Sequence, residues 1–472
     1  MKPQMLGRPG RRLGRLRPLA VLLPAVALAY ANALVAGFHF DDFNIIVDNP
    51  AVHTLSAWWA GMPAIRPLLK LSYALNWSIS PHPFGFHAVN LLLHLANTAL
   101  VWRLSAHFPV PAGLASDRRR LARLVATLLF ALHPIQTEAV TYVSGRSMSL
   151  MATFGLAALL CWLEAPERAR PRLWRGLALL LFAAAVACKE VAVVLPFLLL
   201  LFLRPHSALR SRRTTVEIPV ALPLVFLPLL AWLGYGYLLS APPPRSLAAN
   251  LASEINALFY LLGQLVRPHA LNIDPDLPEY PGWTLRPLLQ AGLLAALLGY
   301  AWRACRQQPW LGFGLAWWLL CLSPMYSLIP RVDLANERHL YMAGLGLYWI
   351  LGVILAHLGW LAPTRHRAAL IVAMAGLGML FTALRNADYR DEVSLWRATA
   401  QRSPAKARVW NNLGYAHALA GQEAAARAAF LEALRLQPGH VRAWRNLRAL
   451  ESGWFSRHAQ AYATADRESK PR

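Results

Sequence analysis

The stretch Pro18–Phe40, PLAVLLPAVALAYANALVAGFHF, contains no Asp, Glu, Lys or Arg and decides the fold class. A helix of about 20 apolar residues is long enough to cross the roughly 30 Å hydrocarbon core of a membrane. We interpret the stretch as an uncleaved first span, because no small-residue cleavage site precedes Phe38 and many apolar segments follow. Basic residues before the span predict a cytoplasmic N-terminus; they are Lys2, Arg8, Arg11, Arg12, Arg15 and Arg17.

The composition of the whole chain also indicates a membrane protein. Of its 472 residues, 57% are hydrophobic and only 15% are charged, although 47 Lys and Arg against 23 Asp and Glu give a net charge of +24. This apolar content exceeds what a polar surface can cover, which argues against a soluble globular protein, a disordered chain and a nucleic-acid-binding protein. The cysteines lie at wide spacings in or beside apolar runs, so they predict neither a disulfide framework nor a metal site.

Further apolar segments predict an all-α fold, a polytopic membrane bundle of about eleven spanning helices. The segments cover residues 87–106, 121–137, 147–163, 173–188, 190–203, 217–240, 285–302, 310–330, 340–361 and 367–384. Odd-numbered spans then run outward, and arginines concentrate in the inner loops, as the positive-inside rule requires. At Lys189–Glu190 we expect a hairpin of two short spans, because one long helix would place the cluster Arg204–Arg213 outside.

The chain changes character at Asp388, after which it is polar, rich in Ala and Arg, and without a further span. A tetratricopeptide pattern of about 34 residues is carried by Trp410, Leu413, Gly414, Gly421, Ala426, Phe430, Ala433 and Pro438. We therefore predict a transmembrane domain at 1–387, with outer loops at 38–86 and 241–286, and a short repeat domain at 388–472 on the outer side. Such a short array must pack on the membrane domain or bind a partner to bury its apolar faces.

Ionisable residues near spanning helices are costly and usually mark a site, so their side of the membrane matters. On the predicted topology they gather at the outer ends of the spans: Asp41, Asp42, His133, Glu138, Arg146, Lys189, Glu190, Arg331, Asp333, Glu337, Arg338 and His339. This one-sided distribution favours chemistry over transport, because a transporter needs polar groups near the midplane. One further set, His87, Asn90, His94 and Asn97, shares a helical face, which predicts either interhelical hydrogen bonds or substrate contacts inside the bundle.

The outer loop 38–86 carries aromatic and basic residues at amphipathic spacing, which is typical of helices in the lipid headgroup layer. They include Trp58, Trp59, Arg66, Lys70, Tyr73 and Trp77. Residues 255–266 have a similar pattern. The two segments predict either plain anchoring or an entrance for an amphipathic substrate that arrives from the bilayer.

Several short motifs occur in order along nearly the whole chain. They are Phe40-Asp41-Asp42, Arg66-Pro67-Leu68, Phe86-His87-x2-Asn90, His133-Pro134-Ile135-Gln136-Thr137-Glu138, Ser144-Gly145-Arg146, Lys189-Glu190, Glu337-Arg338-His339-Leu340-Tyr341 and Arg385-Asn386-Ala387-Asp388-Tyr389. This ordered set resembles the transmembrane and tetratricopeptide-repeat O-mannosyltransferase family and its bacterial relatives. The chain departs from the family at Met148, where the pattern has an acidic residue, and in its short repeat array.

The resemblance implies a GT-C type glycosyltransferase that takes mannose or another hexose from a polyprenyl-phosphate-sugar donor on the extracytoplasmic face. It implies a multi-pass protein of the bacterial inner membrane, in contact with membrane lipids, with a cytoplasmic N-terminus and a periplasmic repeat domain. We expect a protein Ser/Thr hydroxyl as the acceptor, presented by the repeats. The alternatives are a cell-envelope glycan or glycolipid acceptor, and then a lipid-linked sugar transporter or a non-catalytic assembly factor.

The acidic residues agree with this chemistry independently. Displacement at an anomeric carbon needs a carboxylate to deprotonate the acceptor hydroxyl, and a one-step attack inverts that carbon. Asp41 and Asp42 meet this need. Neighbouring side chains in an extended segment point in opposite directions, so we expect one base and one structural partner. Glu138 is a further catalytic candidate, which either positions the acceptor or pairs with Arg146.

The departing lipid phosphate needs cations, for which Arg offers forked hydrogen bonds and Lys a point charge. The candidates, in falling order, are Arg338, Arg146, Lys189 and Arg66; alternatively, Lys189–Glu190 and Arg338–Glu337 are ion pairs that join helix ends. We expect supporting roles for His133, His87, Asn90, Glu190 and His339. No ligand spacing demands a metal, so we assign no cofactor, while a divalent ion between His133, Glu138 and the aspartates stays open.

Overall fold

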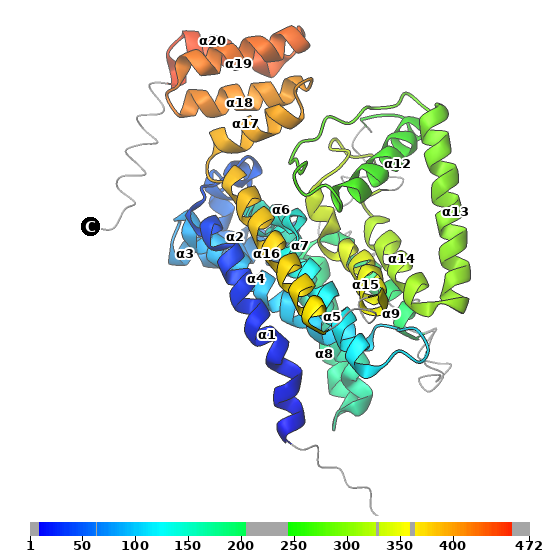
Figure 1. Ribbon diagram of the computed structural model, residues 1–472. Helices are drawn as coiled ribbons and strands as arrows, with labels where there is room; N and C mark the ends of the chain where they lie inside the picture. Colours follow the sequence, from blue (N-terminus) through cyan, green and yellow to red (C-terminus); the bar gives the residue numbers. More distant parts are fainter. Residues whose placement is uncertain (1–8, 63, 204–243, 327–329, 359–363, 456–472) are drawn as a thin grey trace, which may run out of the picture.

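The structure is a computed structural model that describes residues 9–62, 64–203, 244–326, 330–358 and 364–455. Within these ranges every regular element is a helix, so the predicted all-α class is confirmed. The long helices form a bundle (Figure 1). They are α1 (Pro9–Ala29), α4 (Pro83–Leu104), α5 (Ser116–Leu132), α7 (Arg146–Glu164), α8 (Pro171–Cys188), α9 (Leu195–Leu203), α13 (Leu285–Gln307), α14 (Pro309–Leu322), α15 (Leu340–Leu358) and α16 (Thr364–Asp388).

Seven segments of the described chain are long and apolar enough to span a membrane, which confirms a polytopic membrane fold. They are Pro18–Val35, Pro83–His107, Val143–Glu167, Pro171–Cys188, Leu285–Gln307, Glu337–Leu358 and Arg365–Asp388. Two further apolar helices, Glu190–Phe202 and Pro309–Leu322, are shorter, and the predicted span 121–137 corresponds to α5. The predicted span 217–240 and the cluster Arg204–Arg213 lie outside the described residues, so the total of about eleven spans stays a prediction.

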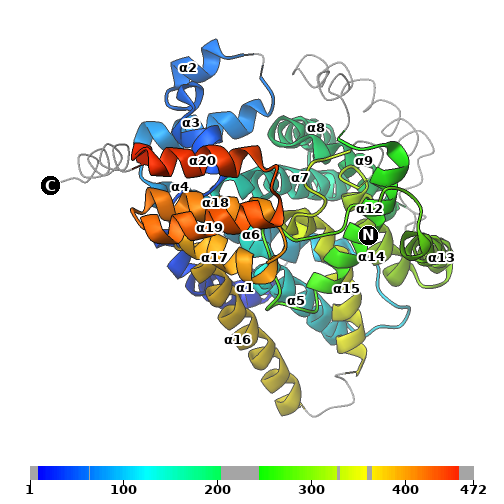
Figure 2. The same ribbon diagram turned by 90° about the horizontal axis from the view of Figure 1, so that it is seen from above.

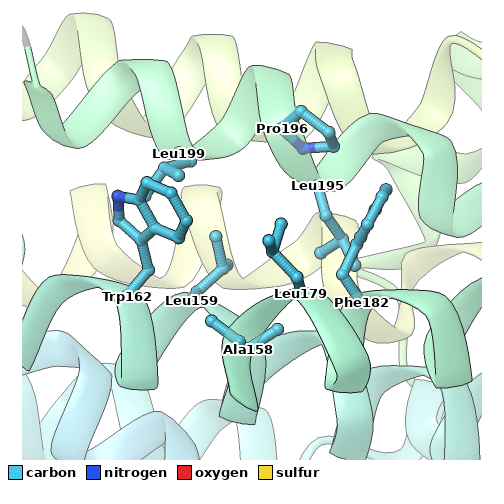
Figure 3. Close-up of a pocket in the computed structure, with 9 residues that line it drawn as sticks. Ala158, Leu159, Trp162, Leu179, Phe182, Leu195, Pro196 and Leu199 are labelled. Carbon is cyan, nitrogen blue, oxygen red and sulfur yellow. The ribbon is translucent and has the colours of Figure 1, made fainter. Parts of the chain in front are cut away.

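The expected break at Lys189 is present. Helix α8 ends at Cys188, Lys189 is extended with φ −159° and ψ 133°, and α9 follows from Leu195. Side chains of α7, α8 and α9 meet in one apolar pocket (Figure 3). The pocket is lined by Ala158, Leu159, Trp162, Ala178, Leu179, Phe182, Leu195, Pro196 and Leu199. Helices α8 and α9 therefore pack against the same neighbour, α7.

Small residues let the central helices approach closely. A Cβ added to Gly352 of α15 would lie 2.5 Å from the carbonyl oxygen of Ala122 in α5. A Cβ added to Gly314 of α14 would lie 2.5 Å from the carbonyl oxygen of Gly346 in α15. In lipid, membrane helices associate through such close packing, because the apolar tails provide no hydrophobic driving force. Helix α15 is thus held between α5 and α14.

The loop after the first span forms two short helices, α2 (Leu55–Ala60) and α3 (Pro67–Ile79). The indole N–H of Trp58 donates to the carbonyl oxygen of Pro67 at 2.9 Å and so joins them, whereas Trp59 is 71% exposed. The second amphipathic segment lies mostly in α12 (Leu247–Gln264). Exposed aromatic residues on short helices suit the headgroup layer, and the role as a substrate entrance stays a prediction.

The last four described helices form a C-terminal helical unit. It consists of α17 (Glu392–Arg402), α18 (Ala407–Leu419), α19 (Glu423–Leu436) and α20 (Val441–Glu451). A Cβ added to Gly414 of α18 would lie 2.6 Å from the ring of Phe430 in α19, so glycine permits the close packing of these two helices. The assignment of the unit to tetratricopeptide repeats and the predicted domain boundary stay predictions.

The C-terminal helical unit packs on one end of the bundle, and the N-terminal end of α1 lies at the opposite end (Figure 1). Seen from above, the unit covers the part of the bundle that contains α4 and the short helix α6 (Thr137–Val140) (Figure 2). Several polar contacts, described below, attach the unit to the bundle. The expectation that a short array packs on the membrane domain agrees with this arrangement.

Candidate functional site

Asp42 is fully buried and joins the end of the first span to the start of α7. Its carboxylate accepts hydrogen bonds from the backbone N–H of His39 at 2.9 Å and of Ser144 at 2.7 Å, and a further one from the Ser144 hydroxyl. Burial raises the pKa of Asp42 to about 6, although these hydrogen bonds oppose the rise. Asp42 is therefore placed as a structural residue.

Asp41 lies beside it but lines a pocket. Its backbone N–H is bound by the hydroxyl of Tyr142 at 3.1 Å. Burial raises the pKa of the Asp41 carboxyl, while the positive charge of Arg338 opposes the rise. The two aspartates thus differ: the Asp42 carboxylate is enclosed by hydrogen bonds, whereas Asp41 lines the pocket.

Glu138 and Arg338 form an ion pair at the wall of the same pocket. Glu138 lies in α6, and Arg338 lies in the helical turn Glu337–His339 that leads into α15. One carboxylate oxygen of Glu138 accepts from the Arg338 guanidinium at 2.9 Å, and the other accepts from the Arg338 backbone N–H at 3.0 Å. The Glu138 side chain is fully buried and that of Arg338 is 17% exposed. The predicted alternative, in which Glu138 pairs with Arg146, is wrong because Arg338 takes that place.

The pocket gathers residues from the bundle, from the loop after α12 and from the C-terminal helical unit. It encloses about 320 Å³, a volume that includes space open to solvent. Its lining residues are Phe40, Asp41, Glu138, Tyr142, Ile273, Asp274, Asp333, Asn336, Arg338, Trp396 and Arg408. Polar residues from five distant segments therefore share one small space.

Four carboxylates line the pocket, and three of them have cationic partners. Besides Glu138, Asp274 pairs with Lys406 at 2.6 Å and with Arg408, and Asp333 pairs with Arg408 at 2.8 Å. Burial would raise the pKa of Asp333, but Arg408 outweighs it and lowers that pKa. Among the described residues, no cationic group lies within 4.0 Å of the Asp41 carboxylate. Asp41 thus differs from the other three pocket carboxylates, each of which has a cationic partner within this distance.

Arg146 lies outside the pocket, in contrast to its predicted role at a phosphate. It is fully buried, and its guanidinium donates to Asn90 at 2.7 Å, to Asn76 at 2.9 Å and to the carbonyl oxygen of Phe86 at 3.0 Å. It also lies over the ring of Tyr73, at 4.9 Å from the ring centre. With these partners in place, a lipid phosphate has no access to Arg146, so this residue joins α3, α4 and α7 instead.

The remaining cation candidates lie at the tip of the α8–α9 hairpin. Arg66 donates two hydrogen bonds to Glu190, at 2.7 and 3.0 Å, so the partner of Glu190 is an arginine of the outer loop. Lys189 is buried, and its ammonium group lies 3.4 Å from the hydroxyl of Ser147. The alternative pair Arg338–Glu337 is wrong, because Glu337 binds Arg385 at 3.2 Å while Arg338 binds Glu138.

The polar stripe of α4, which includes the predicted supporting residues His87 and Asn90, is buried and forms hydrogen bonds within the bundle. His87 lies 3.3 Å from the carbonyl oxygen of Gly37, and Asn90 donates to that of Val140 at 3.1 Å. His94 and Asn97 both bond the hydroxyl of Tyr341, at 2.8 and 3.0 Å. All four are buried, so the prediction that this stripe faces the bundle interior is confirmed, in the form of interhelical hydrogen bonds.

His133 and His339 are also bound elsewhere. One ring nitrogen of His133 lies 3.0 Å from the carbonyl oxygen of Leu265, and the other accepts from the backbone N–H of Ile135 at 3.2 Å. His339 lies 2.8 Å from the Tyr326 hydroxyl. In the part of the chain that the structure describes, no three His, Cys, Asp or Glu side chains are grouped to hold a metal ion. A metal that joins His133, Glu138 and the aspartates does not fit this arrangement.

The sequence did not point to Asp274, Trp396 or Arg408. Asp274 follows α12 in an Asp- and Pro-rich loop that matches no motif, and the other two belong to the C-terminal helical unit, where the repeat pattern drew attention to apolar positions. The sequence could have indicated Tyr142 as a site residue, because it lies between the motifs at 133–138 and 144–146.

The chain is similar to curated proteins over most of its length. It is 26% identical over 519 residues to protein O-mannosyl-transferase TMTC3 of Mus musculus, a match that covers 94% of this chain and 54% of the relative. It is 27% identical to TMTC4 of Homo sapiens, over 84% of this chain and 63% of the relative. It is 31% identical to Tmtc2 of Drosophila melanogaster, over 59% of this chain and 33% of the relative.

The chain spans about half of the length of the TMTC3 proteins that it matches. No family model and no solved structure matches it. The matches to the TMTC3 proteins nevertheless cover more than nine-tenths of this chain. Over most of its length, the chain is thus similar to curated proteins that are named protein O-mannosyl-transferases.

Proposed function

We propose that the protein is a membrane glycosyltransferase that moves mannose or another hexose from a polyprenyl-phosphate donor to a Ser/Thr hydroxyl of a protein. The observation that carries the proposal is the meeting of Asp41, Glu138 and Arg338 in one pocket, although they come from three distant segments. The names of the similar proteins, protein O-mannosyl-transferases, support the same reaction class.

In this proposal Asp41 is the general base. It removes the proton from the acceptor hydroxyl while that oxygen attacks the anomeric carbon, which is then inverted. Asp41 is favoured over Asp42 because the Asp42 carboxylate is enclosed by His39 and Ser144. It is favoured over Glu138 because both oxygens of Glu138 accept from Arg338. Burial strengthens Asp41 as a base, since it raises the pKa of the carboxyl.

Arg338 is the leading candidate for the departing phosphate. It is the bundle arginine in the pocket wall, and its guanidinium has both charge and a forked arrangement of donors. Lys189 and Arg66 remain candidates for the same phosphate, although neither lines the pocket that contains Arg338. Arg146 is no longer one, because it is buried among Asn76, Asn90 and Phe86.

The apolar pocket between α7, α8 and α9 supports a lipid-linked donor (Figure 3). Helices α8 and α9 flank Lys189 and Glu190 in the sequence. The apolar pocket and these two polar site candidates therefore belong to the same hairpin. The residues that line this pocket are all apolar, as a site for a prenyl chain requires. We place the pocket that contains Asp41 on the extracytoplasmic face of the bacterial inner membrane, with a cytoplasmic N-terminus.

A glycan or glycolipid acceptor is the second candidate function. The first helices of the C-terminal helical unit contribute Trp396 and Arg408 to the pocket wall. These two pocket residues belong to α17 and α18, so the unit contributes to the pocket itself and does not only flank it. The acceptor therefore needs an experiment of its own.

The test is mass spectrometry of envelope proteins and glycans from a deletion strain that carries the wild-type gene, Asp41→Asn or Glu451→Gln. Glu451 is a matched control, because it is an exposed carboxylate on α20 that pairs with Arg427. We expect Asp41→Asn to lose a hexose from specific proteins, with turnover lower by about 10²–10⁴-fold, and Glu451→Gln to restore it. A changed glycan with unmodified proteins supports the second candidate, and full restoration by Asp41→Asn contradicts both.

A further inference from the structure

The residue before Asp41 has an unusual backbone. Phe40 adopts φ 45°, in the left-handed region that favours glycine, and Arg66 is the other described non-glycine residue with a positive φ. For an L-amino acid this region is strained, because Cβ comes too close to the following carbonyl group. Such a conformation persists only where surrounding contacts hold it. The contacts of Phe40 therefore decide where the next residue, Asp41, points.

The C-terminal helical unit supplies these contacts through one side chain, Glu392, at the start of α17. One of its carboxylate oxygens accepts from the backbone N–H of Phe40 at 2.6 Å, and lies 3.5 Å from a ring nitrogen of His39. The other oxygen accepts from the indole N–H of Trp396 at 2.8 Å. The ring of Trp396 in turn meets that of Phe40 edge to face, with 5.3 Å between ring centres.

The neighbouring segment is held by the same part of the chain. The ring of His39 is fully buried and bonds the carbonyl oxygen of Tyr389 at 2.7 Å, and the N–H of Gly37 donates to that of Arg390 at 3.3 Å. On its other side, Asp41 is held through its N–H by Tyr142. Residues 37–41 are thus fixed between the segment 389–396 and the bundle.

We propose that Glu392 is a positioning residue, which holds Phe40 in its left-handed conformation and thereby directs the Asp41 carboxylate into the pocket. The C-terminal helical unit is then part of the reaction centre, in addition to any role in presenting an acceptor. Glu392 itself does not reach the pocket lining, so it acts through Phe40. This inference rests on the proposed role of Asp41 as the base.

The test compares full-length wild-type protein with Glu392→Ala, Glu392→Gln and Glu432→Ala by two measurements. The first is hydrogen–deuterium exchange of peptides that cover residues 38–43, which reports directly on the Phe40 N–H. The second is turnover with a synthetic prenyl-phosphate-mannose and envelope protein from a deletion strain. Glu432 is the matched control, since its ion pair with Arg435 lies within α19.

For Glu392→Ala we expect about tenfold faster exchange of these peptides, because the Phe40 N–H loses its acceptor. We also expect kcat to fall about 100-fold with an unchanged KM for the donor, because the base is misplaced while donor binding is not. Glu392→Gln keeps an oxygen acceptor and should restore most of both properties. Glu432→Ala should leave both unchanged.

Unchanged exchange or unchanged kcat in Glu392→Ala overturns the inference, provided that Asp41→Asn is inactive in the same assay. If Asp41→Asn is as active as the wild type, the proposed function itself has failed. If Glu392→Ala does not fold, Glu392→Asp replaces it: the shorter side chain withdraws the carboxylate from Phe40, and a normal kcat in that variant is again contrary to the inference.

Discussion

A carboxylate oxygen of Glu138 and the guanidinium of Arg338 lie 2.9 Å apart, although 200 residues separate them in the sequence. The second carboxylate oxygen accepts from the Arg338 backbone N–H, so one acidic side chain fixes both the backbone and the guanidinium of a residue in the turn before α15. The Glu138 side chain is fully buried, which makes each charge dependent on the other. This pair connects α6 to α15 at the pocket wall.

Glu138→Ala is therefore expected to lower stability by about 3 kcal/mol, because it leaves a mostly buried guanidinium without its counter-charge. The measurement is the thermal midpoint of the detergent-solubilised protein. Glu451→Ala is the control, because it breaks a pair between side chains that are 46% and 58% exposed and should shift the midpoint little. Equal shifts for the two variants would contradict a structural role for Glu138.

The sequence predicted the participants of the site better than their pairings. The motifs identified Asp41, Asp42, Glu138 and Arg338, because ionisable residues beside apolar spans are rare and stand out. The same reasoning placed Arg146 at a phosphate, because charge alone does not reveal that neutral acceptors enclose its guanidinium. Which carboxylate binds which cation depends on helix packing, and packing is not encoded in any short motif.

The contribution of the C-terminal helical unit was beyond the reach of local patterns. Arg408 and Glu392 contact partners more than a hundred residues away in sequence, on Asp274 and Phe40. The pattern of apolar residues predicted that this part of the chain is helical and packs on the membrane domain or on a partner. It carried no information about which polar residues of its first helices meet the bundle.

A pH experiment tests the burial of Asp42. Its folded pKa of about 6 exceeds the ordinary value of 3.8, so the folded state binds this proton more tightly than the unfolded state. This contribution to stability is complete below about pH 4 and is lost as the pH rises through about 6, and it amounts to about 3 kcal/mol. The thermal midpoint of the wild type should therefore fall relative to that of Asp42→Asn as the pH rises from 4 to 7. A difference that is constant across this range contradicts a raised pKa of Asp42.

Arg408→Gln tests the link between the C-terminal helical unit and the pocket. Arg408 pairs with Asp274 and Asp333, and its removal leaves Asp333 as an uncompensated negative charge near Asp41. Both the lost positive charge and the exposed negative one raise the pKa of Asp41 further. We expect the acidic limb of the pH profile of kcat to move to higher pH. The control is Arg427→Gln, whose partner is Glu451 on α20; a profile identical to the control would count against this link.

Gly145→Ala tests the close approach between Gly145 and the backbone of Glu138 and Ala139. A Cβ at Gly145 would overlap the carbonyl oxygen of Glu138 and lie 3.0 Å from the Cα of Ala139, and backbone atoms cannot move aside as flexible side chains do. The turn must then shift, which separates Ser144 from Asp42 and Glu138 from Arg338, and we expect a stability loss of about 3 kcal/mol or more. Gly376→Ala in α16 is the control: nothing lies within 4 Å of the added Cβ, so alanine should stabilise the helix by about 0.5–1 kcal/mol. Thermal midpoints that move in opposite directions are the expected result, because the first glycine is required for space and the second is not.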